Sequence, residues 1–445
     1  MSESDIKKIV KEKNLAFVGV TFIDLTGIPR VKPTVIEGLD SVLSKGARTA
    51  RASIALNSIG GLTPGSSTDP SQGDLVVIPD LKTFVVPSYA PSTAMLIGDF
   101  HELDGTISPY CSRGIYQKTL SKAAELGYQF RAGLEFEFCV VTRQDGEIVP
   151  LDNAPIFSQG GYYFHHDLLS EYSSALASVN VKVHKAHVEG GTGQLEIDLV
   201  SQTGLKVADD FIYFKETIKQ ITRRHGWIAS FMPKIGAHWW GNGLHVHMNL
   251  SDSNGMNVFS DEQDKNGLGL SNKAYNFIGG VLEHVRALCA LTAPTPNSYK
   301  RLLPGTWNAD AVFYASGHRG AAIRVPDERG PKARIECRFL DCACNPYLAM
   351  AGILAAGLEG IQRKCDPGQR INYDTSMTDR ELKKRGLKLL PRSLGEALDE
   401  LEKDQLLRQT LGEAMVEEYL KQKSFEVAQA ANQVTQWEID HYLEL

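Results

Sequence analysis

The sequence lacks the features that mark several other classes of protein. Lysine and arginine number 47 against 53 aspartates and glutamates, so no basic excess is present to hold nucleic acid or anionic lipid. Residues 1–5 do not begin a signal peptide, since they are neither basic nor followed by an apolar run. The most apolar long segment, 346–361, contains Glu359 and is too short to span a bilayer. We therefore expect a cytoplasmic protein that acts on small molecules, with no nucleic-acid or membrane partner.

Cysteine is scarce, and the usual phosphate-binding motif is missing. The seven cysteines show no spacing typical of a disulfide framework, and Cys342 and Cys344 lack the further ligands that a zinc site needs. We expect reduced, structural thiols. No Gly-x-x-x-x-Gly-Lys-Ser/Thr sequence occurs, and the Gly-Gly-Thr-Gly at 190–193 has no lysine after it. The P-loop class of nucleotide-binding proteins is thus excluded.

The first hundred residues predict a small strand-rich unit. Residues 15–24 and 28–33 flank Leu-Thr-Gly, which favours a hairpin, and 75–78 and 94–98 are two more apolar strands. Residues 58–73 are rich in Gly, Ser, Thr and Pro, and a loop this long in a compact unit is usually functional or disordered.

The rest of the chain alternates strands with helices. Its helical segments are 109–127, 208–225, 272–292 and 345–363, followed by about fifty helical residues at the C-terminus. At 445 residues the chain is long for one core, so two domains are expected, divided near residue 105.

Four short stretches place charged or polar residues at alternate positions. In the first, Glu135 and Glu137 fall on one face of a strand while Leu134, Phe136 and Phe138 fall on the other. If the apolar faces pack under helices, the polar faces must line one common cavity. The four stretches are 134–138, 194–198, 245–249 and 334–338.

Such a cavity would collect about five carboxylates, which cannot all stay ionised without cations. The carboxylates are Glu135, Glu137, Glu189, Glu196 and Glu336. Oxygen ligands with a single imidazole suit Mg²⁺ or Mn²⁺ better than zinc. The alternative is a network of ion pairs, because Arg334 and Arg338 share the strand face of Glu336.

A cluster of cationic side chains follows within forty residues. Guanidinium groups match phosphates and carboxylates, and divalent ions beside converging arginines are typical of phosphoryl transfer, with ATP the expected donor. The cluster comprises Lys300, Arg301, Arg319, Arg324, Lys332, Arg334 and Arg338.

Six of these segments, in this order, resemble the glutamine synthetase family over essentially the whole chain. The segments are Gly-Leu-Glu-Phe-Glu-Phe at 133–138, Glu189 with Gly-Gln-Leu-Glu at 193–196, 231–234 with 241–247, 297–302, 319–326 and 334–338. The resemblance implies an α+β fold, with a small N-terminal β-grasp domain over 1–105 and a catalytic domain over 106–445 built on a curved antiparallel sheet with flanking helices. It also implies a homo-oligomer of stacked rings with active sites between subunits, and we expect the loop 58–73 to cross that boundary.

By the same resemblance, two or three Mg²⁺ or Mn²⁺ ions and ATP serve the site. One ion, near the substrate carboxylate, would be held by Glu137, Glu189 and Glu196, and the ion that binds ATP by Glu135, His245 and Glu336. Nucleotide binding would fall to His247, Arg319, Arg324, Lys332 and Arg334. Arg301 and Arg338 would bind glutamate and, with Arg319 and Ser53, would be catalytic. Gly241, Trp240 and Trp307 would complete substrate binding.

The chain departs from the family where ammonium is held. The family's Asp-Gly-Ser-Ser-Ile becomes Ala-Arg-Ala-Ser-Ile at 50–54, so its aspartate is absent. Trp307 stands where the family has a glutamate, and Trp240 where it usually has asparagine. Ammonium must lose a proton before it attacks, so a site without these carboxylates should handle it poorly. The resemblance therefore implies a ligase that phosphorylates the γ-carboxylate of glutamate and couples it to an alkyl or aryl amine.

Three alternatives remain open. The two tryptophans could pack in a core instead of facing an amine, and Asp310 could replace the missing glutamate, which would restore ordinary glutamine synthesis from ammonia. A non-catalytic, structural ring is a different class, but all six expected metal ligands are present.

Overall fold

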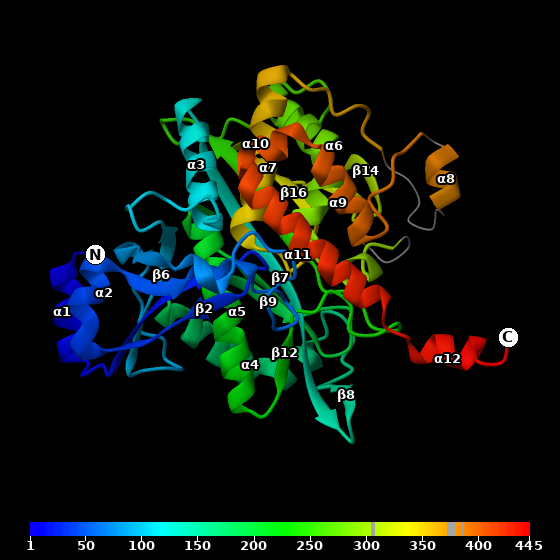
Figure 1. The fold of residues 1–445 in the computed structure, drawn as a ribbon. Helices are drawn as coiled ribbons and strands as arrows, with labels where there is room; N and C mark the ends of the chain where they lie inside the picture. The colour runs from blue at the N-terminus through cyan, green and yellow to red at the C-terminus, as the bar shows by residue number, and fades with distance from the viewer. Residues whose placement is uncertain (304–307, 372–378, 385) are drawn as a thin grey trace.

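The computed structural model describes residues 1–303, 308–371, 379–384 and 386–445 (Figure 1). The N-terminal part forms a mixed sheet in the order β2-β1-β6-β5-β4, with β3 beside β1. Strands β1 and β6 are parallel, and β1 and β2 form the expected hairpin. Its elements are α1 (Glu3–Glu12), β1 (Phe17–Ile23), β2 (Pro29–Val31), β3 (Thr34–Val35), α2 (Leu39–Lys45), β4 (Ala47–Ala50), β5 (Asp74–Pro79) and β6 (Thr93–His101).

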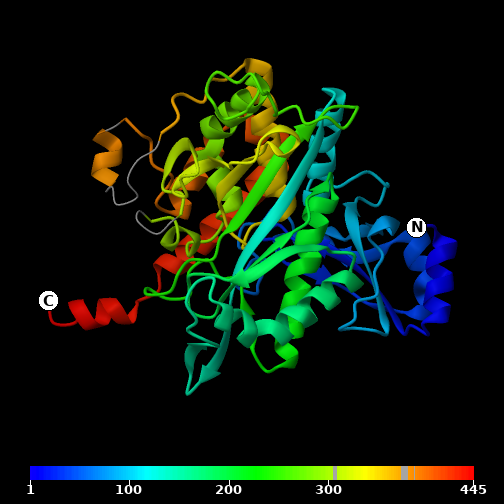
Figure 2. The ribbon, with the colours of Figure 1, turned by 180° about the vertical axis from the view of Figure 1, so that it is seen from behind.

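A second, larger sheet carries the four polar stretches. Its order is β14-β15-β16-β13-β7-β10-β9, with β8, β11 and β12 also paired to the long strand β7. Figure 2 shows β7 and β13 as neighbouring strands through the middle of the molecule. The strands are β7 (Gln129–Gln144), β8 (Glu147–Pro150), β9 (Val183–Val188), β10 (Gln194–Leu199), β11 (Gln202–Thr203), β12 (Ile228–Ser230), β13 (Leu244–Ser251), β14 (Ala311–Ser316), β15 (Ala321–Val325) and β16 (Ile335–Leu340).

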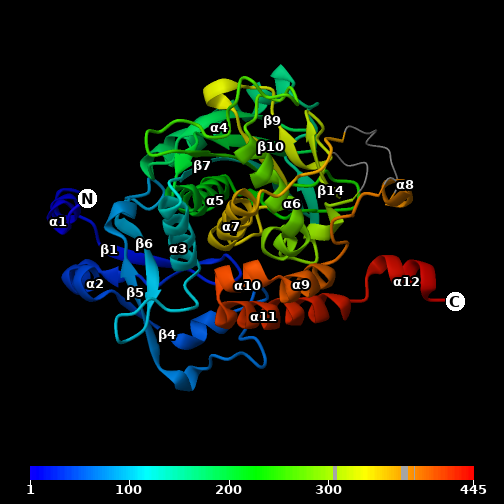
Figure 3. The ribbon, with the colours of Figure 1, turned by 90° about the horizontal axis from the view of Figure 1, so that it is seen from above.

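Helices cover one face of this sheet in two layers. Figure 3 shows α5, α6 and α7 between the sheet and the C-terminal helices α9, α10 and α11. The helices are α3 (Ser112–Glu125), α4 (Gln159–Ser178), α5 (Lys206–Arg224), α6 (Asn272–Thr292), α7 (Pro346–Arg363), α8 (Asp379–Lys384), α9 (Leu394–Lys403), α10 (Gln405–Leu411), α11 (Glu413–Ala431) and α12 (Gln436–Tyr442). Within the described ranges, none is both long and apolar enough for a membrane span.

The alternation along β7 explains why the sheet buries one face. Phe136 stacks on Phe214 of α5 with ring centroids 4.0 Å apart, and Phe138 lies 5.1 Å from Phe231. These rings are buried, and each aromatic ring removes 150–250 Å² from water. Because the apolar face is fixed in this way, Glu135 and Glu137 must point to the opposite face.

The two sheets share one continuous hydrophobic core. Between them Arg113 of α3 is buried, with its guanidinium 3.1 Å from Asp99, 2.8 Å from Asp80 and 3.0 Å from Asp209 of α5. A buried guanidinium is tolerated because these carboxylates compensate its charge. The predicted α+β fold with a curved sheet and flanking helices is confirmed. A domain division at residue 105 stays a prediction.

Candidate active site

The polar faces of the four stretches meet on adjacent strands, as the sequence predicted. Glu135 lies opposite Asp198 on β10 and opposite His245 on β13. Glu137 lies opposite Glu196. Directly opposed residues have Cβ atoms about 5 Å apart, so the strand register alone brings these side chains together.

The first cluster consists of Glu135, His245 and Glu336, whose ligand atoms lie within 4.8 Å of one another. Nδ1 of His245 is 2.6 Å from Glu135 and 3.8 Å from Glu336. All three side chains are buried. This is the set that we expected to hold the ion bound to ATP.

The second cluster contains two of the three residues expected to hold the ion near the substrate carboxylate. The residues that group within 4.8 Å are His187, Glu189 and Glu196. Glu137 accepts a 2.6 Å hydrogen bond from the Gly243 N–H and lines the same cavity as Glu189 and Glu196. Sequence reasoning missed His187, although the pattern His-Val-Glu at 187–189 places it on the strand face of Glu189.

A third acidic group, Glu135, Glu196 and Asp198, also lies within 4.8 Å. Nζ of Lys185 on β9 is 3.1 Å from Asp198 and 3.6 Å from Glu196. This lysine therefore places a built-in positive charge beside the third group. Lys185 was missed, whereas Asp198 belongs to the predicted polar stretch 194–198 but was not named as a metal ligand.

The carboxylates divide into two electrostatic classes. Burial and the neighbouring Glu135 and Glu137 raise the pKa of Glu196 to about 10, and burial with Glu137 raises the pKa of Glu189 to about 7. Burial opposes ionisation of Glu336 too, but nearby Arg338 and the two histidines of β13 lower its pKa to about 2. Ionising the first class thus requires added positive charge.

The donor atoms fit divalent metal ions. Oε2 of Glu189 and Oδ1 of Asp198 are buried and have no hydrogen-bond partner among the described residues. A buried carboxylate oxygen without a partner is costly unless a cation satisfies it. Hard oxygen donors, with one imidazole in each of the first two clusters, match Mg²⁺ or Mn²⁺.

A narrow cavity lies beside the second cluster. Its lining residues are Glu137, Glu189, Gln194, Glu196, Trp240, Gly241, His245, Asn308, Arg319 and Arg338. Arg301 lies behind this wall, 1% exposed, and donates to Oδ1 of Asn308 at 2.7 Å and to the carbonyl of Leu340 at 2.5 Å. Its side chain packs so closely on Gly241 that a Cβ there would overlap Cγ of Arg301.

The ion-pair alternative holds only in part. Glu336 pairs with Arg338 and with Arg324 of β15. Arg334 instead lies 3.1 Å from Glu328 and donates to Nδ1 of His247 at 3.2 Å. These pairs leave the buried Glu189 oxygen unexplained, so ion pairing alone does not account for the cavity.

A groove of about 980 Å³ opens next to the first cluster. Four of the five residues expected to bind ATP line it, namely His247, Arg324, Lys332 and Arg334. The fifth, Arg319, faces the narrow cavity instead. Since Glu135 lines the groove and Glu137 the cavity, successive carboxylates of β7 serve two adjoining compartments.

The three residues expected near the amine differ in where the structure places them. Trp240 is 42% exposed and covers Gly190, where a Cβ would lie 2.5 Å from its ring, so it is not a core residue. Ser53, in the turn Arg51–Ala55, hydrogen-bonds to Thr49 at 2.8 Å and is not among the residues that line the cavity of its own chain. Trp307 lies outside the described residues.

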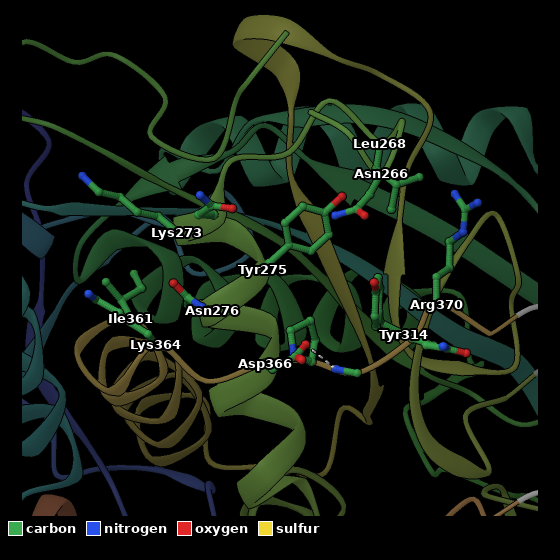
Figure 4. Close-up of a pocket in the computed structure, with 14 residues that line it drawn as sticks. Asn266, Leu268, Lys273, Tyr275, Asn276, Tyr314, Ile361, Lys364, Asp366 and Arg370 are labelled. Carbon is green, nitrogen blue, oxygen red and sulfur yellow. Dashed lines mark hydrogen bonds between the residues drawn. The ribbon is translucent and has the colours of Figure 1, made fainter. Parts of the chain in front are cut away.

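Another cavity, of about 950 Å³, lies between the ends of α6 and α7. Tyr275, Tyr314, Lys273 and Arg370 are among its lining residues, and none of the carboxylate clusters reaches it. Figure 4 shows Lys273 and Arg370 on opposite sides, so its cations do not converge on one point.

Comparison with known proteins agrees with this geometry. Residues 109–442 match the family model described as the glutamine synthetase catalytic domain. The chain belongs to the glutamine synthetase family. It is therefore a carbon–nitrogen ligase, of a family that uses ATP and divalent metal ions.

Relatives within the glutamine synthetase family match most or all of the chain. A glutamate–methylamine ligase from Methyloversatilis universalis is 33% identical over 100% of both chains, and a glutamine synthetase from Halobacterium salinarum is 35% identical over 84% of each. A solved structure described as a GmaS/ADP complex superposes with a TM-score of 0.88 at 32% identity, covering 98% of this chain and 99% of the other.

Proposed function

We propose that the chain phosphorylates the γ-carboxylate of glutamate with ATP and couples it to a small organic amine, giving a γ-glutamyl amide. The observation that carries this proposal is Trp240, whose indole lines the narrow cavity beside the carboxylate of Glu189. A large apolar surface at this place is suited to an alkyl or aryl group, and unlike a carboxylate it cannot accept the proton that ammonium must lose. The similarity to a methylamine ligase supports the same substrate class.

In this proposal the groove binds the nucleotide and the narrow cavity binds glutamate. Lys332, Arg334 and His247 would hold the nucleotide in the groove, and Arg338 would bind a carboxylate of glutamate in the cavity. Arg301, held behind Gly241, would complete that binding. Two or three Mg²⁺ or Mn²⁺ ions, held by the clusters described above, would supply positive charge to the transferred phosphoryl group.

The second step follows from the same side chains. The amine first gives up the proton of its ammonium form to water; its freed lone pair then forms the C–N bond, and phosphate leaves with the electron pair of the C–O bond. The surplus proton on nitrogen would pass to Glu189, whose carboxylate lines the cavity. Arg319, on the same lining, would neutralise charge on the leaving phosphate.

Ordinary glutamine synthesis is the second candidate, because Glu189 keeps a buried oxygen that could accept a hydrogen bond from ammonium. The test is steady-state ADP release with glutamate and ammonium, methylamine, ethylamine, isopropylamine, ethanolamine, putrescine or aniline. We expect a small monoamine to give the highest kcat/KM. Ammonium as the best substrate would overturn the proposal. In Trp240→Asn, which has the residue usual in the family, preference should move toward ammonium.

A ring-shaped homo-oligomer is part of this proposal. Helix α12 projects from the body of the chain with Trp437 56% and Leu443 78% exposed (Figure 1), and such apolar residues are suited to burial against another subunit. Ser53 would reach an active site only across a subunit boundary. The loop 58–73 is anchored to its own α11, where Ser67 N–H donates to Glu418 at 2.8 Å.

A cytoplasmic location is consistent with the seven free thiols.

A further inference from the structure

Phe157 combines two unusual features at the edge of the second cluster. It is a large apolar residue that is 63% exposed, and its φ is +57°. The other non-glycine residues with positive φ in the described chain are Asn14, Asp145, Asn180 and Lys364. Asparagine and aspartate adopt this region readily, whereas a bulky residue there is an outlier, and such strain is concentrated at functional sites.

Hydrogen bonds fix the backbone that carries this ring. The Phe157 N–H donates to the carbonyl of Val188 at 3.1 Å, and the next residue, Ser158, caps α4 by accepting from the Gly161 N–H at 3.1 Å. Asp152 pairs with the buried His165 of the same helix, which anchors the segment on both sides. The Cα of Phe157 therefore has a defined position beside β9.

The ring of Phe157 contacts His187 of the second cluster. Its centroid is 4.9 Å from that of His187, and Nε2 of His187 is 3.4 Å from Glu196. Phe157 is bonded to Val188 on one side of Glu189, while Trp240 covers Gly190 on the other. The chain segment that carries Glu189, beside which the amine would sit, therefore contacts an aromatic residue on each side of that position in the sequence.

We propose that Phe157 is a specificity-determining residue, and that its ring is one wall of the pocket for the alkyl group of a small primary alkylamine, with Trp240 the other. The nitrogen would lie at Glu189 and its short carbon chain between the two rings. A flat or bulky aryl amine would have to displace one of them. This inference rests on the proposed function and adds the size and class of the amine.

The test compares kcat/KM for ethylamine and for ammonium in wild type, Phe157→Asn and Phe157→Leu. Asparagine retains the left-handed backbone and removes the ring, and leucine keeps an apolar surface. We expect Phe157→Asn to lower kcat/KM for ethylamine about tenfold, mainly through KM, with less than about a twofold change for ammonium, since a contact to one carbon is worth about 10–200-fold. Phe157→Leu should lose less.

Tyr163→Asn is the matched control, because Tyr163 is also 63% exposed and lies on α4. It should leave the ethylamine to ammonium ratio unchanged. A ratio unchanged in Phe157→Asn would overturn the inference, and so would an equal loss for both amines with altered oligomeric state in native mass spectrometry, which would make Phe157 a subunit contact. A wild-type enzyme that prefers ammonium would instead refute the proposed function.

Discussion

The two faces of β7 are built from alternate residues and have opposite effects on the molecule. Phe136 and Phe138 bury apolar surface against α5 and favour the folded state. Glu135 and Glu137, one position away, bring charge into a buried cavity, which opposes folding unless cations compensate. The comparison teaches that one face holds the strand in place so that the other can hold carboxylates closer together than stability alone would allow.

The largest effect should come from removing a buried ring from the apolar face of β7. Phe136→Ala removes a fully buried ring, and such changes cost about 3–5 kcal/mol of unfolding free energy. Urea unfolding followed by circular dichroism measures this loss. Tyr163→Ala, on the surface of α4, should change stability by no more than about 0.5 kcal/mol. Equal stability of the two variants would show that β7 is not held by this packing.

Removing a carboxylate from the polar face of the sheet should leave the fold stable and abolish most of the ligase activity. Glu196→Gln keeps the volume of the side chain but removes a metal ligand, so we expect ADP release to fall about 100- to 1,000-fold. The metal-free variant should unfold at no lower temperature than wild type near pH 7, because Glu196 is already protonated there. A large loss of stability would contradict the proposed division between the two faces.

The alternation of polar and apolar residues made the two faces of β7 predictable from the sequence. It placed Glu135 and Glu137 on one face, and the helix expected over 272–292 has the same bounds in α6. Local periodicity sets strand faces and amphipathic helices, so elements of this kind can be read from one stretch of chain.

Contributions that depend on strand pairing could not be predicted. Strand β9 reads Val-His-Lys-Ala-His-Val, and its polar residues Lys185 and His187 gain a role only because β9 pairs with β10, opposite Asp198 and Glu196. The position of Arg319 in the narrow cavity, not the nucleotide groove, likewise depends on tertiary structure. No local pattern reports which strands become neighbours.

A smaller effect should follow from changing Gly241, which lines the narrow cavity and packs against Arg301. Gly241→Ala would force Cγ of Arg301 to move, and misplacement of a substrate-binding group by about 1 Å can cost up to about 100-fold in rate. We expect a rise in KM for glutamate with little change in KM for ATP. Gly160→Ala is the control, since nothing lies within 4 Å of its added Cβ. An unchanged KM for glutamate would remove Arg301 from the binding site.

The smallest effect, and the most direct measure of the polar face, is the pH dependence of metal stabilisation. The pKa values of Glu189 and Glu196 in the folded chain, about 7 and about 10, lie above the usual 4.5. Groups with a raised folded pKa contribute stability that is complete below pH 4.5 and is lost as pH rises through the folded value. The Tm of the metal-free protein should therefore fall between about pH 4.5 and pH 10.

Mg²⁺ binds the deprotonated carboxylates, so the gain in Tm on adding it should grow over the same range, by a few degrees. Differential scanning calorimetry with and without Mg²⁺ measures both slopes. Glu189→Gln should reduce the slope between pH 4.5 and pH 7, and Glu196→Gln should reduce the slope up to pH 10, because each removes one titration. A Tm difference independent of pH would mean that these carboxyls are already ionised without metal, and the carboxylates on the polar face of the sheet would then cost the fold far less than the apolar face of β7 contributes.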